Sequence, residues 1–259
     1  MTQRTASPTE VTRSTSTSQL AAEVAGTMIL VFSVAGAAIF GAEFDQGHGG
    51  LNFGFFGVAF ALGLSVLVGS YAFGPLSGGH FNPAVTIGLA IAGRHPWRRV
   101  PGYVLAQIVG GVIGSSLLVI IAAGGPHQFL ADARATGFAS TGWGPLSPGG
   151  FPLPSSFFIE VVTTCVLLWV ILAVTSERSN PATAPVAIGL TLLLVALIAI
   201  PVSNGSFNPA RSIATAIYGG STALTQLWMS VVAPLLGAVI AGISYAALFE
   251  RESNALKAD

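Results

Sequence analysis

Two copies of one short motif carry the clearest chemical signal in the sequence. Each copy reads Asn-Pro-Ala, and the six residues are Asn82, Pro83, Ala84, Asn208, Pro209 and Ala210. Asn is a strong N-cap residue, and Pro fits the first position of a helix. Each motif therefore predicts a helix start. One such motif would indicate only an ordinary capped helix, but two together indicate a site built from a pair of helix ends.

Arg211 is the second signal, because it stands three residues after Asn208 in the first turn of the second predicted helix. A cation at that position opposes the helix dipole, so local helix stability does not explain it. No acidic residue lies near it in the sequence, which makes a structural ion pair a weak alternative. We therefore predict a functional role for Arg211.

The composition predicts that both motifs are embedded in a membrane. Of 259 residues, 52% are hydrophobic and 8% are charged, against about 25% charged in a soluble domain. Crossing the ~30 Å hydrocarbon core takes about 20 apolar residues. The only formal charges in the qualifying segments are Glu23 and Glu160, which argues against buried helices of a soluble protein. The six predicted spans are 20–41, 53–73, 100–123, 157–175, 183–201 and 227–249.

The basic residues orient these spans. On one side of the predicted membrane lie eight basic residues: Arg4, Arg13, Arg94, Arg98, Arg99, Arg178, Arg251 and Lys257. The other side holds only Arg134 and the acidic loop 42–52. The positive-inside rule then places both termini in the cytoplasm. We expect a multi-pass protein of the plasma (inner) membrane. We expect a disordered cytoplasmic tail at 1–18 and a cytoplasmic tail at 251–259; the Ser-rich, basic composition of the first tail also faintly resembles a transit peptide.

The segment 19–250 contains an internal repeat, with one copy at about 19–123 and the other at about 155–250. Besides the two motifs, Glu23 with Thr27 matches Glu160 with Thr164. Each copy has three spans, so the second must be inverted relative to the first. Each copy also has a half-length apolar stretch after its motif, 82–93 or 208–218, which rises ~15 Å as a helix. Inverted repeats with broken helices place a site near the bilayer midplane.

Two helix N-termini meeting there would superpose their dipoles into a positive potential that repels cations, including hydronium. As a cap, each Asn uses its side-chain oxygen on the backbone, and its amide N–H groups stay free to face a pore. A water molecule between Asn82 and Asn208 would accept from both, so its own hydrogens point outward. This orientation interrupts a proton wire.

The two embedded carboxylates and one histidine are further candidates. Glu23 and Glu160 are predicted to be structural, accepting backbone N–H groups of the re-entrant loops, with a pore role as the alternative. His80 precedes the first motif, and we expect it either to line the cytoplasmic half of the pore or to pack within the loop. The single cysteine, Cys165, lies in an apolar run and is expected to be buried.

At these residues the sequence resembles the aquaporin, or major intrinsic protein, family, and is most similar to its bacterial water channels. The likeness covers about 20–250, including SGGHFNPAVTIG, GFASTGWGPLSPGG and SNGSFNPARSIATA. It implies an all-α membrane channel with six spans and two re-entrant half-helices, which passes water without catalysis or a cofactor. It also implies a homotetramer with one pore in each chain.

The resemblance further implies a filter formed by Phe55, Ala196, Gly205 and Arg211. Water channels of the family usually have His at the second position, and Thr or Cys at the third. Because Ala196 and Gly205 stand there instead, we expect a wider pore. Ser212 follows the arginine, as it does in water channels, where glycerol-conducting members usually carry Asp.

Three functions remain open at this point. The first is a water channel, and the second is a facilitator of glycerol, urea or ammonia through the wider filter. The third is a secondary transporter, which would need Glu23 or Glu160 as a coupling site. No acid, base and nucleophile constellation indicates an enzyme, and the four histidines lack the spacing of a metal site. The zero net charge gives no indication of a nucleic-acid partner.

Overall fold

The computed structural model describes residues 15–41 and 53–250, and within them it is helical. Six helices are long and apolar enough to cross a membrane. They are α1 (Ser16–Gly36), α2 (Gly54–Ser77), α4 (Val100–Ala123), α6 (Leu153–Val174), α7 (Ala184–Ser203) and α9 (Gly220–Tyr245). The shorter helices are α3 (Pro83–Ile91), α5 (Phe129–Ala135) and α8 (Pro209–Ala216). The predicted class, six spans with two half-helices, is confirmed.

Short turns extend this framework. The π-helical turns Ala37–Gly41 and Ala246–Glu250 continue α1 and α9, and 3₁₀ turns lie at Trp97–Arg99 and Gly144–Leu146. α1 begins inside the segment that we predicted as a disordered tail, because the Thr15 side chain caps it by accepting from the Ser18 N–H. The rest of that tail (1–14), the acidic loop 42–52 and the tail 251–259 lie outside the described residues.

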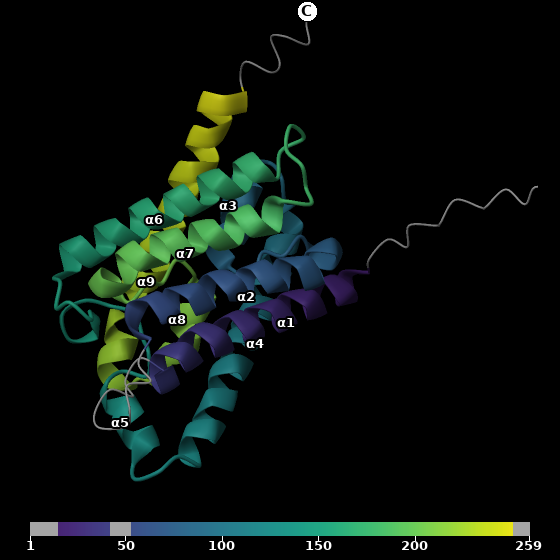
Figure 1. Cartoon of the computed structure of the whole chain (residues 1–259). Helices are drawn as coiled ribbons and strands as arrows, with labels where there is room; N and C mark the ends of the chain where they lie inside the picture. The colour runs from purple at the N-terminus through teal and green to yellow at the C-terminus, as the bar shows by residue number, and fades with distance from the viewer. Residues whose placement is uncertain (1–14, 42–52, 251–259) are drawn as a thin grey trace, which may run out of the picture.

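The long helices pack side by side in an arrangement that repeats between the two halves (Figure 1). α1 packs on α4 in the first half, as α6 packs on α9 in the second, while α2 packs on α7 across the centre. The half-helices cross between the halves: α3 packs mostly on α9, and α8 mostly on α4. The two repeats are therefore interlocked, and neither forms a separate domain.

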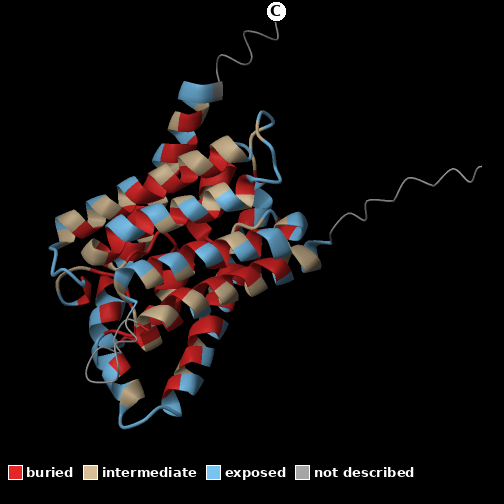
Figure 2. Cartoon of the chain, viewed as in Figure 1, coloured by how far each residue is buried: buried red, intermediate tan, exposed pale blue. Residues whose placement is uncertain are grey.

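Many large apolar residues are exposed, and exposed positions alternate with buried ones along the long helices (Figure 2). Ile120 and Phe158, for example, are each 69% exposed. A soluble monomer rarely exposes so large a continuous apolar surface, whereas lipid tails solvate it well. The buried side of the same helices carries the polar residues, among them Glu23, Gln107 and Glu160. This inside-out polarity is what a helix bundle in a bilayer requires.

Glycines allow the pairs α1–α4 and α6–α9 to approach closely. A Cβ on Gly110 would collide with the carbonyl oxygen of Val24, and one on Gly114 would lie 2.7 Å from that of Met28. In the second half, a Cβ on Gly237 would collide with the carbonyl oxygen of Val161. Each neighbour is backbone, which cannot rotate away as a side chain can. Small residues at such crossings allow the backbones of two membrane helices to come into contact.

We expect Gly237→Ala to destabilise the protein by roughly 1–3 kcal/mol, the usual cost of overpacking. Gly74→Ala is the matched control, because Gly74 is also helical and a Cβ there meets no atom within 4 Å. Thermal unfolding of both variants in detergent, followed by size-exclusion chromatography, measures the difference. Equal midpoints for the two variants would contradict the close approach of α6 and α9.

Candidate functional site

Both Asn-Pro-Ala motifs cap helices, as the sequence predicts. The Asn82 Oδ1 accepts from the Ala84 N–H at 2.8 Å, at the start of α3. The Asn208 Oδ1 accepts from the N–H groups of Ala210 and Arg211, at 3.0 and 3.3 Å, at the start of α8. Pro83 and Pro209 each occupy the first helical position.

The same two asparagines join the repeats to each other. The Asn82 Nδ2 donates to the Phe207 carbonyl oxygen at 2.8 Å, and the Asn208 Nδ2 donates to the Phe81 carbonyl oxygen at 2.8 Å. We predicted that both N–H groups of each amide stay free, and this is wrong for one of them. A side-chain amide carries two N–H groups. In each asparagine, one of them donates to the opposite loop, and the other remains available for a further acceptor.

A buried carboxylate holds each re-entrant loop. Glu23 accepts from the backbone N–H groups of His80 (3.0 Å) and Phe81 (2.7 Å). Glu160 accepts from those of Ser206 (2.7 Å) and Phe207 (2.8 Å). Both carboxylates are fully buried, so these bonds replace the water that the charges would otherwise need. Their contacts are the structural ones that we predicted.

Two serines that sequence reasoning missed complete this support. Ser77 and Ser203 end α2 and α7, and their hydroxyls donate to Glu23 (2.7 Å) and Glu160 (2.6 Å). Each hydroxyl also accepts a backbone N–H two residues later. The available signal was their matched place in the repeat, five residues before each motif asparagine.

The residues that precede the asparagines adopt an unusual backbone. Phe81 has φ 50° and Phe207 has φ 53°, both in the left-handed region that non-glycine residues rarely visit. This conformation persists only where the surroundings enforce it. The carboxylate bond to each N–H and the asparagine bond to each carbonyl do so. The carbonyls are thereby fixed at the meeting point of the loops.

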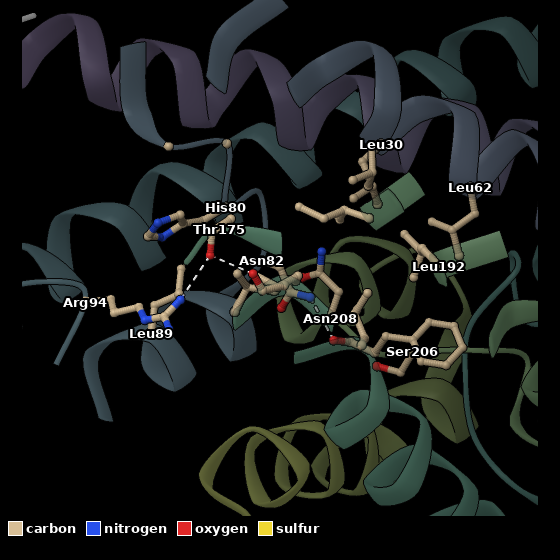
Figure 3. Close-up of a pocket in the computed structure, with 18 residues that line it drawn as sticks. Leu30, Leu62, His80, Asn82, Leu89, Arg94, Thr175, Leu192, Ser206 and Asn208 are labelled. Carbon is tan, nitrogen blue, oxygen red and sulfur yellow. Dashed lines mark hydrogen bonds between the residues drawn. The ribbon is translucent and has the colours of Figure 1, made fainter. Parts of the chain in front are cut away.

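Two cavities lie along the interface between the repeats. The inner cavity, of about 260 Å³, opens on the side that holds the loop 92–99 and the end of α6. Its apolar wall includes Leu30, Leu62, Val66, Leu167 and Leu192, and both motif asparagines line it (Figure 3). The wall offers water few partners except at the asparagines. With such a lining, water binds at the asparagines and moves along the rest of the wall without strong hydrogen bonds.

Polar groups gather at the wide end of the inner cavity. His80 lines it, as one of our two readings predicts, and its Nδ1 lies 3.1 Å from the Thr86 hydroxyl. Arg94 also lines it and donates to the Thr175 hydroxyl at 3.3 Å (Figure 3). Arg94 donates to the Leu172 carbonyl at 2.5 Å as well. The charge of Arg94 is therefore fixed at the entrance.

His95 packs behind His80, with ring centroids 4.8 Å apart in an edge-to-face contact. Tyr103 contacts both rings and donates from its hydroxyl to the Ser77 carbonyl at 2.8 Å. Burial, together with the nearby Arg99 charge, lowers the pKa of the His95 imidazole below its usual range. This shift favours the uncharged form of the ring that packs behind His80.

The outer cavity, of about 280 Å³, lies beside α5 and the loop that follows it. Phe55, which we predicted as a filter residue, lines this cavity and is 46% exposed. It stands two turns of α2 before Leu62, which lines the inner cavity instead. Phe55 therefore lies in the wide vestibule. Val58 and Ile200 line the outer cavity deeper in the protein.

Arg211 is 1% exposed, and its guanidinium is held by backbone oxygens. One terminal nitrogen donates to the Ala139 carbonyl at 2.8 Å and to the Thr215 hydroxyl at 3.2 Å, and the other donates to the Asn204 carbonyl at 3.4 Å. The Nε has no partner among the described residues. The loop that supplies Ala139 was not part of our sequence-based site, because nothing in its pattern marks a carbonyl as a ligand.

Four buried hydroxyls hold the loops around Arg211. The Thr141 hydroxyl lies 2.8 Å from that of Ser212 and donates to that of Ser230 at 2.7 Å. The Ser206 hydroxyl lies 2.7 Å from that of Ser212. Ser212 therefore links the half-helix α8 to the outer loop and to the re-entrant loop. This role needs a small hydroxyl at 212.

The two remaining predicted filter residues line neither cavity. Ala196 is fully buried, and Gly205, with φ 61°, faces its neighbours. A Cβ on Gly205 would lie 3.0 Å from the Phe207 Cε2 and 3.1 Å from the Ile200 Cγ1. The gap that we expected at this position is therefore filled by adjacent side chains.

Comparisons with known proteins agree with this geometry. The sequence profile of the family described as Major intrinsic protein matches residues 10–245. The chain belongs to the major intrinsic protein family. It is 47% identical over 231 residues to Aquaporin Z from Photorhabdus laumondii, covering 89% of this chain and 97% of that protein. It is 44% identical over 234 residues to Aquaporin Z from Brucella melitensis, covering 90% and 99%.

Among solved structures, the aquaglyceroporin from Plasmodium falciparum superposes with a TM-score of 0.80 and 24% sequence identity. The match covers 93% of this chain and 100% of the other. At that identity the likeness establishes the fold alone. Membership of the major intrinsic protein family makes the chain a multi-pass membrane channel and not an enzyme.

Glu160→Gln should destabilise the protein by roughly 1–3 kcal/mol, because an amide places N–H groups where the carboxylate now accepts three donors. Glu177→Gln is the control, since Glu177 is an exposed acid on a loop. The measurement is the midpoint of thermal unfolding in detergent. A Glu160→Gln midpoint equal to that of the control would show that the carboxylate does not hold the second loop.

Proposed function

We propose that the chain conducts water passively across the membrane and excludes protons and ions. One observation supports this most directly: two half-helix starts meet head to head, and their asparagines line a cavity whose wall is largely apolar between them and the polar groups at its wide end. A water molecule there accepts from the N–H that each asparagine leaves unused. The water channels named above, at 44–47% identity, support water as the substrate.

Exclusion of charge follows from two fixed sources of positive potential. The N-termini of α3 and α8 both point their dipoles at the asparagines. Arg211 adds a full charge on the side of the outer cavity. Proton exclusion by an arginine and by half-helix dipoles is a known property of aquaporin-type pores, which we apply to this chain.

The orientation and assembly are also part of the proposal. Six spans place the two ends of the bundle on the same side, and the arginines of the loops 92–99 and 175–183 support a cytoplasmic position for that side. The inner cavity then opens to the cytoplasm. From the family resemblance we expect a homotetramer with one pore in each chain, which native mass measurement in detergent tests.

Vesicles that contain the protein should shrink faster in a sucrose gradient than empty vesicles, in stopped-flow light scattering. Leu192→Trp should abolish most of this difference, because Leu192 lines the inner cavity and a larger ring fills it. Leu190→Trp is the matched control, since Leu190 lies on the same helix but is 55% exposed on the outer surface. Equal shrinkage of wild-type and empty vesicles would refute water conduction.

Arg211→Val should produce a measurable proton or cation leak, because it removes the fixed charge and keeps the helix dipoles. Exclusion should therefore weaken and not vanish. Proton flux under a pH gradient, in vesicles loaded with a pH-sensitive dye, measures the effect. Arg134→Val on α5 is the control, since it removes an exposed arginine outside the bundle. Unchanged proton flux in Arg211→Val would refute the barrier.

A further inference from the structure

The surroundings of Gly205 in the structure differ from what the sequence predicts. The absent side chains at Ala196 and Gly205 predict a wide, permissive constriction. In the structure, however, the ring of Phe207 and the side chain of Ile200 lie 3.0 and 3.1 Å from the position of a Gly205 Cβ. Phe207 lines the inner cavity and Ile200 lines the outer one. The two side chains therefore meet at the boundary between the cavities.

The internal repeat shows why Phe207 stands there. Phe81 is its counterpart, and the ring of Phe81 packs away from the pore into space left by two glycines. A Cβ on Gly26 would collide with that ring, and one on Gly69 would lie 3.1 Å from it. Phe81 is fully buried and lines neither cavity.

The second repeat does not offer Phe207 the same space. Gly26 lies three residues after Glu23, and Thr163 lies three residues after Glu160. Gly69 lies eight residues before Ser77, and Val195 lies eight residues before Ser203. Both glycines are thus replaced by β-branched residues. The positions that leave room for the Phe81 ring in the first repeat therefore carry side chains in the second. The Phe207 ring lies 3.0 Å from the position of a Gly205 Cβ, whereas the Phe81 ring lies 3.5 Å from that of a Gly79 Cβ.

We propose that Phe207, supported by Ile200, is the side chain that sets the size limit of the pore, in place of the side chains absent at Ala196 and Gly205. This rests on the proposed water conduction. An aromatic ring offers no acceptor to a hydroxyl that has lost its water, so a polyol or urea is both too wide and poorly solvated at this point. Water is small enough to pass and finds its partners at the asparagines, which line the inner cavity.

The test is Phe207→Val, which removes the ring and keeps an apolar residue. Stopped-flow light scattering of vesicles with sucrose, and then with glycerol or urea, gives the ratio of solute to water permeability. We expect this ratio to rise roughly tenfold or more, the scale on which an apolar pocket discriminates by size. Phe158→Val is the matched control, because it removes a ring that is 69% exposed on the outer surface of α6; its ratio should equal that of the wild type.

Phe207→Leu is the second variant, because it keeps most of the volume and is expected to fold with a smaller rise in the ratio. A folded Phe207→Val protein with the wild-type ratio would overturn the assignment. So would wild-type vesicles that already take up glycerol as fast as the variant, or a failure of both variants to fold, since the ring would then be only a core residue. Absence of water flux in the wild type would instead refute the proposed function itself.

Discussion

Two hydrogen bonds at the centre of the molecule determine most of what surrounds them. Each runs from the side-chain amide of Asn82 or Asn208 to the backbone carbonyl that precedes the other asparagine. The amide is used at both ends, because its oxygen caps a helix while its nitrogen crosses to the other repeat. Neither asparagine can therefore rotate without losing a bond at both places. The spacing of the loops, the direction of both half-helices and the position of the remaining N–H groups follow from this pair.

The rest of the support is electrostatic and comes from within each repeat. Glu23 and Glu160 bring a negative charge to the outer side of each loop, while the helix starts bring positive potential to the inner side. Hydrogen bonds from the backbone and from serine hydroxyls offset the desolvation cost of the two carboxylates, so that no water is needed behind the loops. The wall of the inner cavity is then largely apolar, with polar side chains at the asparagines, at Ser206 and at the entrance.

The sequence predicted what depends on local rules and on the repeat. Hydropathy identified the six spans, Asn-Pro capping identified the half-helices, and matched positions identified both glutamates. It could not predict features that depend on which side chain fills a space. Phe55 was assigned to the filter by position along α2, but two helical turns separate it from Leu62. The gap at Gly205 looked open because a sequence does not show that Phe207 and Ile200 enter it.

The interlocked half-helices have a consequence for how the chain is made. α3 belongs to the first repeat but packs mostly on α9, which is synthesised after the other five spans that the structure describes. Until α9 has been synthesised, the polar ends of α3 lie in the bilayer without the helix on which α3 mostly packs. Contacts that join such distant parts of a chain form late, because the closing of long loops costs entropy first. The pore is thus completed only when α9 is in place, and a chain that stops before α9 has the residues of both motifs but no closed wall to hold them.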